Sequence, residues 1–427
     1  MTGPGTGTPG RVPTGAGADP AGPDAGAADD RGRPVGDPPR VALVGANGHG
    51  RWHRRAIAPL HAAGRLRLVA LVDVRPLEDE PTAPVPPDAR VLTDHRAMLA
   101  ATRPDVVVVC TPPHTHLPIA LDVLDAGADL LLEKPPVLDL AEHRALAAAS
   151  AATRRAVQVG FQALGSAALT ELTDALAAGR LGRVTGIATV AAWQRPDAYY
   201  ARSPWAGRRS LGGRPALDGA LANPLAHAVM QCLAVVEAVA GAPAAPERIE
   251  VERYRVRPIE VDDTAVLRVT PRGGPPVLAA VTLAGEDFIA GEVLVTGERG
   301  RALLEYPTDR LRLPGDPGPR AVPGRRGLLE NLLDHRAAGT PLIAPVSRTA
   351  PFTAVLDALR SAPEPTLLGG DLVRRVGDGP ERVRVIRGVD AVLRAAAETG
   401  ALPSEAGVPW AVRPYVVDGS DVEAPQR

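Results

Sequence analysis

The stretch RVALVGANGHG, residues 40–50, joins a short apolar run to a cluster of three glycines. The segment RWHRRAIAPLHAAG (51–64) follows with helical spacing of its apolar residues and ends in Gly64, a residue typical of helix C-termini. The segment LRLVALVD (66–73) then reads as a second strand, which ends in Asp73. This order of strand, glycine turn, helix and strand predicts a βαβ unit.

A glycine turn at the end of a first strand is typical of dinucleotide-binding sheets, because its backbone N–H groups can approach a pyrophosphate at a helix N-terminus. The usual GxGxxG pattern would place glycine at position 47, where this chain has Asn47, whose side chain we expect to crowd the phosphate. Asp73 favours NAD over NADP because its carboxylate would repel a 2′-phosphate, although the nearby Arg75 leaves NADP open. The expected turn residues are Gly45, Asn47, Gly48, His49 and Gly50.

Two further apolar runs end in polar residues. The stretch DVVVVCTPPHTH (105–116) reads as a buried parallel strand that breaks at Thr111 and Pro112, and a helix follows it. The stretch AGADLLLEKPP (126–136) delivers Glu133 and Lys134 to the end of another strand. Ligands bind outside the carboxyl ends of strands in doubly wound sheets, so these residues should share one edge with the glycine turn.

Lys134 is the only lysine in a chain with 48 basic residues, and every other one is arginine. Arginine keeps its proton under all ordinary conditions, whereas burial and neighbouring charges can tune a lysine ammonium until it gives up its proton. The retained lysine is therefore a candidate catalytic residue. The alternative is a chance survivor or a surface ion pair.

With the glycine turn, the TPPHTH segment and AGADLLLEKP together, the chain resembles the Gfo/Idh/MocA oxidoreductases. The resemblance implies an NAD(P)-dependent enzyme acting on sugars, polyols or their derivatives, with Lys134 beside the nicotinamide and the reacting hydroxyl. It also implies that His116 belongs to the nicotinamide pocket; exposed loop positions are the alternative for His114 and His116, and His114 has no assigned role. The cofactor-binding residues expected beyond the turn and Asp73 are Thr111, Pro112, His116, Glu133, Lys134 and Gln162.

Residues 161–412 are predicted to form a second, α+β domain, with a large, mostly antiparallel open sheet from consecutive strands after Arg248. An irregular stretch, residues 195–215, is rich in arginine and aromatic residues and is typical of a lid or substrate wall. Its arginines could bind substrate carboxylates or hydroxyls, or lie in a solvated loop: Arg195, Arg202, Arg208 and Arg209.

The segment NPLAH (223–227) occupies the place where the family carries D-x-x-x-H. The resemblance makes His227 a candidate general base and puts Asn223 in the place of the aspartate. A neutral amide raises histidine basicity less than a carboxylate does. Either His227 is a weaker base, or Lys134 carries more of the proton transfer, or redox activity is lost. Asn223 could equally be a helix N-cap, and a different alignment gives Asp218 the aspartate's role.

Composition limits the other possibilities. The formal net charge of −1, without blocks of like charge, does not indicate nucleic-acid or membrane binding. Cys110 and Cys232 read as buried thiols, and no metal site is expected. Residues 1–38 are predicted to be a disordered tail rich in Gly, Pro and Ala, and residues 413–427 a flexible tail. No secretory signal or membrane span is recognised, so we expect a cytoplasmic protein.

The fold class predicted is α/β, with a doubly wound Rossmann sheet over residues 39–160 and the α+β domain after it. The predicted function is hydride transfer between NAD, or possibly NADP, and a secondary alcohol of a sugar or polyol, in a homo-oligomer formed through the C-terminal sheet. Two other classes share this fold: a dinucleotide-binding sensor without turnover, and an enzyme that retains NAD for transient oxidation in elimination, epimerisation or glycoside cleavage.

Overall fold

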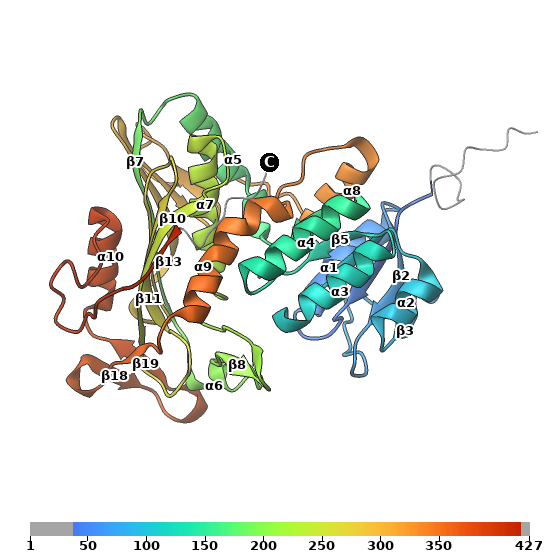
Figure 1. Cartoon of the computed structure of the whole chain (residues 1–427), viewed down its shortest axis with the longest axis horizontal. Coiled ribbons are helices and arrows are strands. Elements are labelled where there is room, and N and C mark those ends of the chain that lie inside the picture. The colour runs from blue at the N-terminus through green and yellow to red at the C-terminus, as the bar shows by residue number, and fades with distance from the viewer. Residues whose placement is uncertain (1–36, 420–427) are drawn as a thin grey trace, which may run out of the picture. The chain divides into compact units, whose positions relative to one another are not determined.

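A computed structural model of the chain describes residues 37–419, so the tails expected at 1–38 and 413–427 lie largely outside the described residues. The chain from Pro39 onward forms one compact unit that contains two sheets (Figure 1). In the described residues, no helix combines the length and the apolar character that crossing a membrane would require.

The first sheet has six parallel strands in the order β3-β2-β1-β4-β5-β6, which is the doubly wound order of dinucleotide-binding domains. The strands are β1 (Arg40–Val44), β2 (Arg67–Val72), β3 (Arg90–Leu92), β4 (Val106–Val109), β5 (Asp129–Leu132) and β6 (Val157–Val159). The helices between them are α1 (Gly50–Ala62), α2 (His95–Thr102), α3 (His116–Asp125) and α4 (Leu140–Thr153). This confirms the expected Rossmann architecture.

Side chains of the central strands alternate between two apolar layers, as strand geometry requires. Ala42, Val107 and Leu130 pack with α2, α3 and α4 on one face. Val41 and Val106 pack on the other face with α1 and with a helix from much later in the chain, α8 (Leu328–Ala338). Both faces of the sheet are therefore covered, which explains why its strands are apolar throughout.

The position of α8 differs from the expected domain boundary, which placed every residue after 160 with the second domain. Arg336 of α8 forms ion pairs with Asp105 (3.2 Å) and Asp129 (2.9 Å) of the first domain. Gln158 of β6 and Asn331 of α8, both fully buried, are joined by a 2.6 Å hydrogen bond. The face beside α1 needs a second helix, and the amphipathic pattern of α8 did not show which sheet it would cover.

The second sheet has nine strands in the order β16-β15-β14-β13-β7-β12-β11-β10-β17, and β20 pairs with β10 as a tenth. Its strands are β7 (Val184–Gln194), β10 (Pro246–Arg255), β11 (Thr264–Pro271), β12 (Val277–Thr282), β13 (Ala284–Gly297), β14 (Gly300–Glu305), β15 (Arg310–Arg312), β16 (Arg320–Ala321), β17 (Thr366–Leu367) and β20 (Tyr415–Asp418). Most neighbours are antiparallel, as expected, but β7–β12 and β10–β17 are parallel. Residues 415–418 belong to this sheet, so the flexible tail expected from residue 413 is wrong there.

Helices cover both faces of this sheet. The helices α5 (Ala167–Ala177), α7 (Ala226–Ala240) and α9 (Ala350–Ser361) pack on one face, and α10 (Val389–Thr399) packs on part of the other. The remaining short elements are α6 (Asp197–Tyr200) and the hairpins β8 (Ser210–Leu211) with β9 (Arg214–Pro215) and β18 (Val373–Val376) with β19 (Val383–Ile386). Because α10 of the same chain covers part of the second face, oligomerisation through that face stays a prediction.

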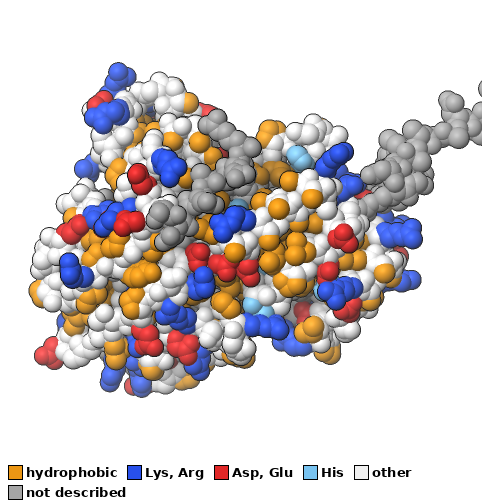
Figure 2. Space-filling model, in the orientation of Figure 1, with side chains coloured by type: hydrophobic (Ala, Val, Ile, Leu, Met, Phe, Trp, Pro, Cys, Tyr) orange, Lys and Arg blue, Asp and Glu red, His pale blue; other side chains and the backbone are white. Residues whose placement is uncertain are grey.

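The surface carries arginines and carboxylates side by side. Figure 2 shows basic and acidic side chains interspersed over the face in view, in keeping with the many arginine–carboxylate pairs, such as Arg67–Asp88 at 2.6 Å. Cys110 and Cys232 are both free thiols, as expected; Cys232 is buried, whereas Cys110 is only partly buried, contrary to the expectation.

We predict that α8 is needed for the stability of the first domain. In Asn331→Leu, the fully buried side-chain amide of Gln158 and the partly buried backbone groups of Pro341 and Ile343 lose the hydrogen bonds that Asn331 makes with them. We expect the free energy of unfolding to fall by about 2–5 kcal/mol, since each unpaired buried group costs about 1–3 kcal/mol. Urea denaturation measures this loss. The control, Ala337→Leu, puts the same residue on the exposed side of α8 and should change stability little.

Candidate active site

The glycine turn between β1 and α1 has a backbone that only glycine allows at two positions. Gly45 has φ +85°, and a Cβ there would lie 2.2 Å from the carbonyl oxygen of Cys110. A Cβ on Gly50, the first residue of α1, would lie 1.8 Å from the carbonyl oxygen of Gly45. The turn therefore folds tightly at the carboxyl edge of the sheet, where the N-terminus of α1 favours negative charge.

Asn47 does not fill the mouth of this turn, contrary to the expectation that its side chain would crowd a phosphate. Its Nδ2 donates to the carbonyl oxygen of Pro76 (3.0 Å), and its Oδ1 accepts from the N–H of Glu78 (2.7 Å). The side chain is buried against the loop after β2, which it ties to the turn. Asparagine thus replaces glycine because its amide satisfies two backbone groups of that loop.

Asp73 lies at the end of β2 and accepts two backbone hydrogen bonds, from Asn47 N and Arg75 N, each 3.0 Å long. A second carboxylate lies nearby, since Glu78 Oε2 is 3.4 Å from the N–H of Gly48. The Arg75 side chain is exposed, and its guanidinium lies 3.9 Å from Asp73 and 3.7 Å from Glu78. This end of the turn is therefore lined by two carboxylates and one loosely held arginine.

His116 is buried and joins two loops at the same edge. Its Nε2 lies 2.8 Å from the carbonyl oxygen of Thr111, and its Nδ1 lies 2.9 Å from that of Pro135. The structure thus excludes the exposed position that was the alternative for His116. His116 fixes the segment that carries Thr111 and Pro112 against the segment that follows Lys134.

Glu133 is buried at the end of β5 and contacts the α1 side of the edge. Its Oε1 lies 2.8 Å from His53 Nε2 and 3.8 Å from His49 Nε2, and Gln162 Nε2 donates to it at 3.2 Å. Burial alone would raise the pKa of Glu133, but the neighbouring imidazoles of His49 and His53 outweigh it and hold the pKa well below its usual value. Glu133 is therefore a buried carboxylate anion.

Lys134 points away from Glu133, to the second domain. Its Nζ donates to Oδ1 of Asn223 at 2.6 Å and to the carbonyl oxygen of Asn223 at 3.1 Å. Burial lowers the pKa of Lys134, and the charges of Glu133 and Asp218 oppose that shift only in part. The lone lysine is thus a buried amine at the carboxyl edge of the sheet, and no surface ion pair accounts for it.

A hydrogen-bonded chain continues beyond Lys134. Asn223 Nδ2 donates to Asp218 Oδ1 (2.7 Å), and Arg202 Nη2 donates to both oxygens of Asp218 (2.9 and 2.7 Å). Asn223 is not the helix N-cap that was one alternative, because α7 begins at Ala226 with Leu225 as its N-cap. Asp218 acts on Lys134 through the amide of Asn223, an arrangement that neither alignment anticipated.

His227 is the second residue of α7. Its ring lies between those of Phe161 (5.8 Å between centroids, edge-on) and Tyr306 (6.2 Å). Its Nδ1 is buried without a hydrogen-bond partner in the described residues. Burial, together with the positive charge of Lys134, lowers the pKa of His227 to about 3. The ring is therefore neutral and is a weak base in this structure.

The arginines of the irregular stretch mostly bind protein groups. Arg208 pairs with Glu260 at 2.6 Å, and Arg209 donates to the carbonyl oxygens of Arg360 and Ala362. Arg202 holds Asp218, whereas Arg195 is stacked over Trp193 (4.8 Å) and Tyr199 (5.2 Å). Sequence reasoning offered them as substrate ligands, but Arg202, Arg208 and Arg209 hold the loop in place.

The structure gathers the expected residues into two groups along one edge. The glycine turn, Asp73, Glu133 and Gln162 lie on the α1 side, while Lys134, Asn223 and His227 lie towards α7. His53 was not predicted as a contributor, and Arg202 was predicted only as a substrate ligand or a solvated loop residue. The spacing of four residues between His49 and His53 on a helix start was the available signal.

Comparison with known proteins supports a dinucleotide-binding site at this edge of the first sheet. Residues 39–161 match the sequence profile of the GFO_IDH_MocA oxidoreductase family, described as an NAD-binding Rossmann fold. Over 145 residues the chain is 37% identical to inositol 2-dehydrogenase 4 of Saccharopolyspora erythraea, an alignment that covers 34% of this chain and 42% of that relative. Over 106 residues it is 36% identical to D-glucoside 3-dehydrogenase of Escherichia coli, covering 24% of this chain and 28% of that relative.

These alignments span less than half the length of either relative, whereas the structural similarity extends further. The WlbA dehydrogenase of Bordetella pertussis, solved in complex with NADH and UDP-GlcNAcA, superposes with a TM-score of 0.62 at 22% identity, over 78% of this chain and 100% of that chain. At this identity the likeness shows the fold alone. The domain over residues 39–161, with its glycine turn, TPPHTH loop and EKP segment at one edge of a doubly wound sheet, thus matches the Gfo/Idh/MocA oxidoreductase family, described as having an NAD-binding Rossmann fold.

Proposed function

We propose that this chain is an NAD-dependent oxidoreductase that transfers hydride between the cofactor and a secondary alcohol of a sugar, a polyol or a derivative. The observation that carries the proposal is the position of Lys134: a buried amine at the carboxyl edge of an NAD-type sheet, held by two oxygens of Asn223 from the second domain. The curated relatives named above are dehydrogenases of inositol and of a glucoside, which supports this substrate class.

The residues present fit a dinucleotide. Only glycine at positions 45 and 50 allows the turn to close this tightly, and the N-terminus of α1 behind it would favour the negative charge of the pyrophosphate. Asp73 would accept hydrogen bonds from the adenosine ribose, and Glu78 adds a second negative charge against a 2′-phosphate. Thr111, Pro112, His116 and Gln162 would line the nicotinamide half. When bound, the cofactor supplies the hydride-accepting or hydride-donating carbon.

Lys134 is suited to hold and move the hydroxyl proton. In the neutral form its two N–H bonds are directed to the two oxygens of Asn223, which leaves the nitrogen lone pair to accept the alcohol proton as hydride departs. In the reverse direction the Lys134 ammonium donates its third proton to the carbonyl oxygen of the ketone substrate. Burial lowers the pKa of Lys134 and so makes both forms accessible, which arginine could not provide.

Asn223 and Asp218 are the positioning residues of this arrangement. A carboxylate beside the amine would favour the ammonium, whereas the neutral amide directs Nζ without doing so. Asp218, itself fixed by Arg202, keeps the Asn223 amide in the orientation that presents its oxygen to Lys134. His227, with its lowered pKa, would contact the substrate as a neutral ring and is not needed as the base.

The non-catalytic alternative rested on Asn47 and Asn223. Both have another explanation: Asn47 ties the turn to a loop, and Asn223 holds the lysine. To test the proposal, the purified protein is examined for bound NAD or NADP, and nicotinamide absorbance is followed against a panel of sugars and polyols. NADH release with a polyol supports it. NAD binding without any redox change across the panel would favour a dinucleotide-binding sensor without turnover. Turnover without net release of NADH would favour an enzyme that retains its NAD for transient oxidation.

We predict that Lys134→Arg abolishes turnover because arginine cannot give up its proton. The value of kcat should fall by roughly 100- to 10,000-fold, the range for loss of general acid–base catalysis, while circular dichroism and NAD affinity by calorimetry stay close to wild type. Arg301→Lys, the reverse exchange at an exposed site on β14, is the control. Wild-type rates in Lys134→Arg would refute the role of a deprotonable amine.

We predict that Asn223→Ala lowers kcat by roughly 10- to 100-fold, because the amine loses the side-chain oxygen that directs it. The pH profile of kcat should shift in the same variant, a change that a purely structural role would not produce. Steady-state kinetics over a pH range measure both. Pro224→Ala, next to it in the same turn, should retain the wild-type profile; an unshifted profile in Asn223→Ala would contradict the positioning role.

We predict that His227 makes the folded state sensitive to acid. The unfolded chain protonates this histidine near pH 6.5, while the folded protein keeps it neutral down to about pH 3. Its contribution to stability is therefore complete above pH 6.5 and is lost as the pH falls towards 3. Urea denaturation should show wild type losing stability more steeply than His227→Gln below pH 6.5, by at most about 1.4 kcal/mol per pH unit. Parallel curves would contradict the lowered pKa.

A further inference from the structure

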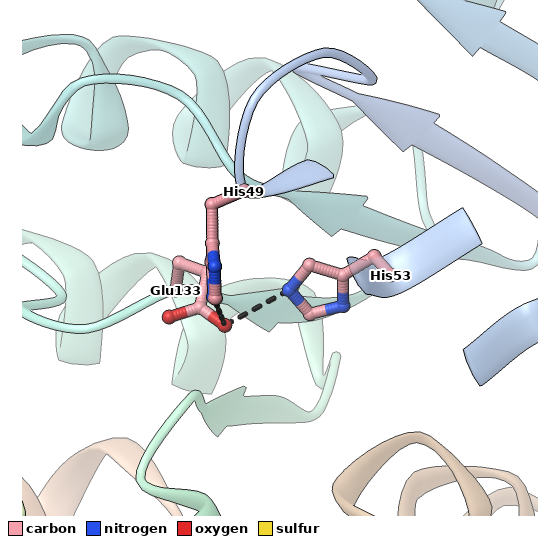
Figure 3. A group of neighbouring side chains, drawn as sticks. All are labelled: His49, His53 and Glu133. Carbon is pink, nitrogen blue, oxygen red and sulfur yellow. Dashed lines mark hydrogen bonds and ion pairs between the residues drawn. The ribbon is translucent and has the colours of Figure 1, made fainter. Parts of the chain in front are cut away.

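A second group of chemically active side chains lies on the α1 side of the edge, where the lysine mechanism does not use it. Figure 3 shows the side chains of His49, His53 and Glu133 converging from the glycine turn, from α1 and from the end of β5. One ligand atom from each lies within 4.8 Å of the other two. Among the described residues, this is the one such group of three histidine, cysteine or acidic side chains.

The two imidazoles and one carboxylate match the ligands of a divalent transition metal. Histidine nitrogen and carboxylate oxygen bind Zn²⁺ at about 2.0–2.2 Å, and three protein ligands with one open position are common. Tetrahedral ligands at that distance lie about 3.4 Å apart. Glu133 Oε1 is 2.8 Å from His53 Nε2 and 3.8 Å from His49 Nε2, so each of these two separations must change by roughly half an ångström. The ligand nitrogens of the two imidazoles lie within 4.8 Å of each other.

The surroundings hold the ligand atoms in place. Trp52 packs against both imidazoles, stacked on His49 at 6.0 Å and edge-on to His53 at 5.0 Å. The other oxygen of Glu133 accepts the backbone N–H of Lys134 at 3.0 Å. Such outer contacts orient metal ligands and raise affinity. The 3.8 Å gap to His49 is too long for a hydrogen bond and leaves room between the groups.

The charge of this group also favours a cation. Within the described residues, the only side chains that form ion pairs with Glu133 are His49 and His53. No arginine or lysine forms an ion pair with this buried carboxylate in the described residues, and burying an incompletely paired charge is costly. A divalent ion would neutralise it. His53 and Glu133 are buried, while the His49 side chain is 60% exposed and gives the ion a path from solvent.

We propose that His49 Nε2, His53 Nε2 and Glu133 Oε1 bind a divalent transition-metal ion of the Zn²⁺ class, with a fourth position open to solvent. Metal binding here does not depend on the proposed function. Metal binding and NAD binding are nevertheless connected, because His49 belongs to the turn over which we place the pyrophosphate. If NAD does bind there, the presence of the metal must change the affinity for NAD, and the two effects are reciprocal.

The test uses the full chain without an affinity tag, first treated with a chelator and then titrated with Co²⁺, which reports tetrahedral coordination by its visible absorption. We expect one equivalent to bind, to quench Trp52 fluorescence and to be displaced by Zn²⁺. In His49→Asn the affinity should fall by at least about 100-fold, the upper range for changes in outer contacts. His49 is exposed, so the variant should fold, as circular dichroism will check.

His95→Asn is the matched control, because His95 forms a 2.7 Å pair with Asp122 but has no second imidazole beside it. This variant should bind Co²⁺ as wild type does. No visible band in wild type, or equal affinity in wild type and His49→Asn, would overturn the site. Calorimetry with NAD, with and without Zn²⁺, then tests whether metal and NAD bind at the same turn. An NAD affinity that Zn²⁺ leaves unchanged would refute binding of both at this turn. A protein that binds no NAD even without metal would refute the proposed function instead.

Discussion

The hydrogen bonds from Lys134 Nζ to Asn223 both direct the amine for the proposed chemistry and join the first sheet to the second domain. A buried amine without acceptors would be costly, and no group of the first sheet contacts this nitrogen by a hydrogen bond in the described residues. The acceptors come from the segment before α7, which Asp218 and Arg202 fix in turn. The position of the second domain's loop is therefore set by the same interaction that directs the amine.

Two adjacent residues of opposite charge, just beyond the end of β5, have separate surroundings because their side chains contact different elements. Glu133 faces the histidines of α1, and Lys134 faces α7. A direct ion pair between them would have held Lys134 as an ammonium, and the separation weakens that effect. Burial then dominates the pKa of Lys134, while His53 and His49 keep Glu133 ionised.

The sequence identified what depends on local pattern. Apolar strands that end in polar residues, glycines that a tight turn requires, and a single lysine after a buried strand were sufficient to predict a doubly wound first sheet and the edge at which these residues gather. Contacts set by long-range packing were not accessible. The amide of Asn223 reads equally well as a helix cap, and its link to Asp218 depends on a loop conformation with no period. Likewise, the spacing of His49 and His53 hints at a shared face, but nothing local brings Glu133, 80 residues further on, to it.

The return of α8 to the first sheet also bears on how the protein is made. The apolar face that Val41 and Val106 present beside α1 is complete only once Leu328–Ala338 has docked. During synthesis from the N-terminus, that face has to wait until almost the whole second sheet, from β7 to β16, has emerged. The first sheet thus precedes the second in the chain but cannot be finished before it, and a nascent chain stalled before α8 would carry a bare apolar surface open to chaperones or to aggregation.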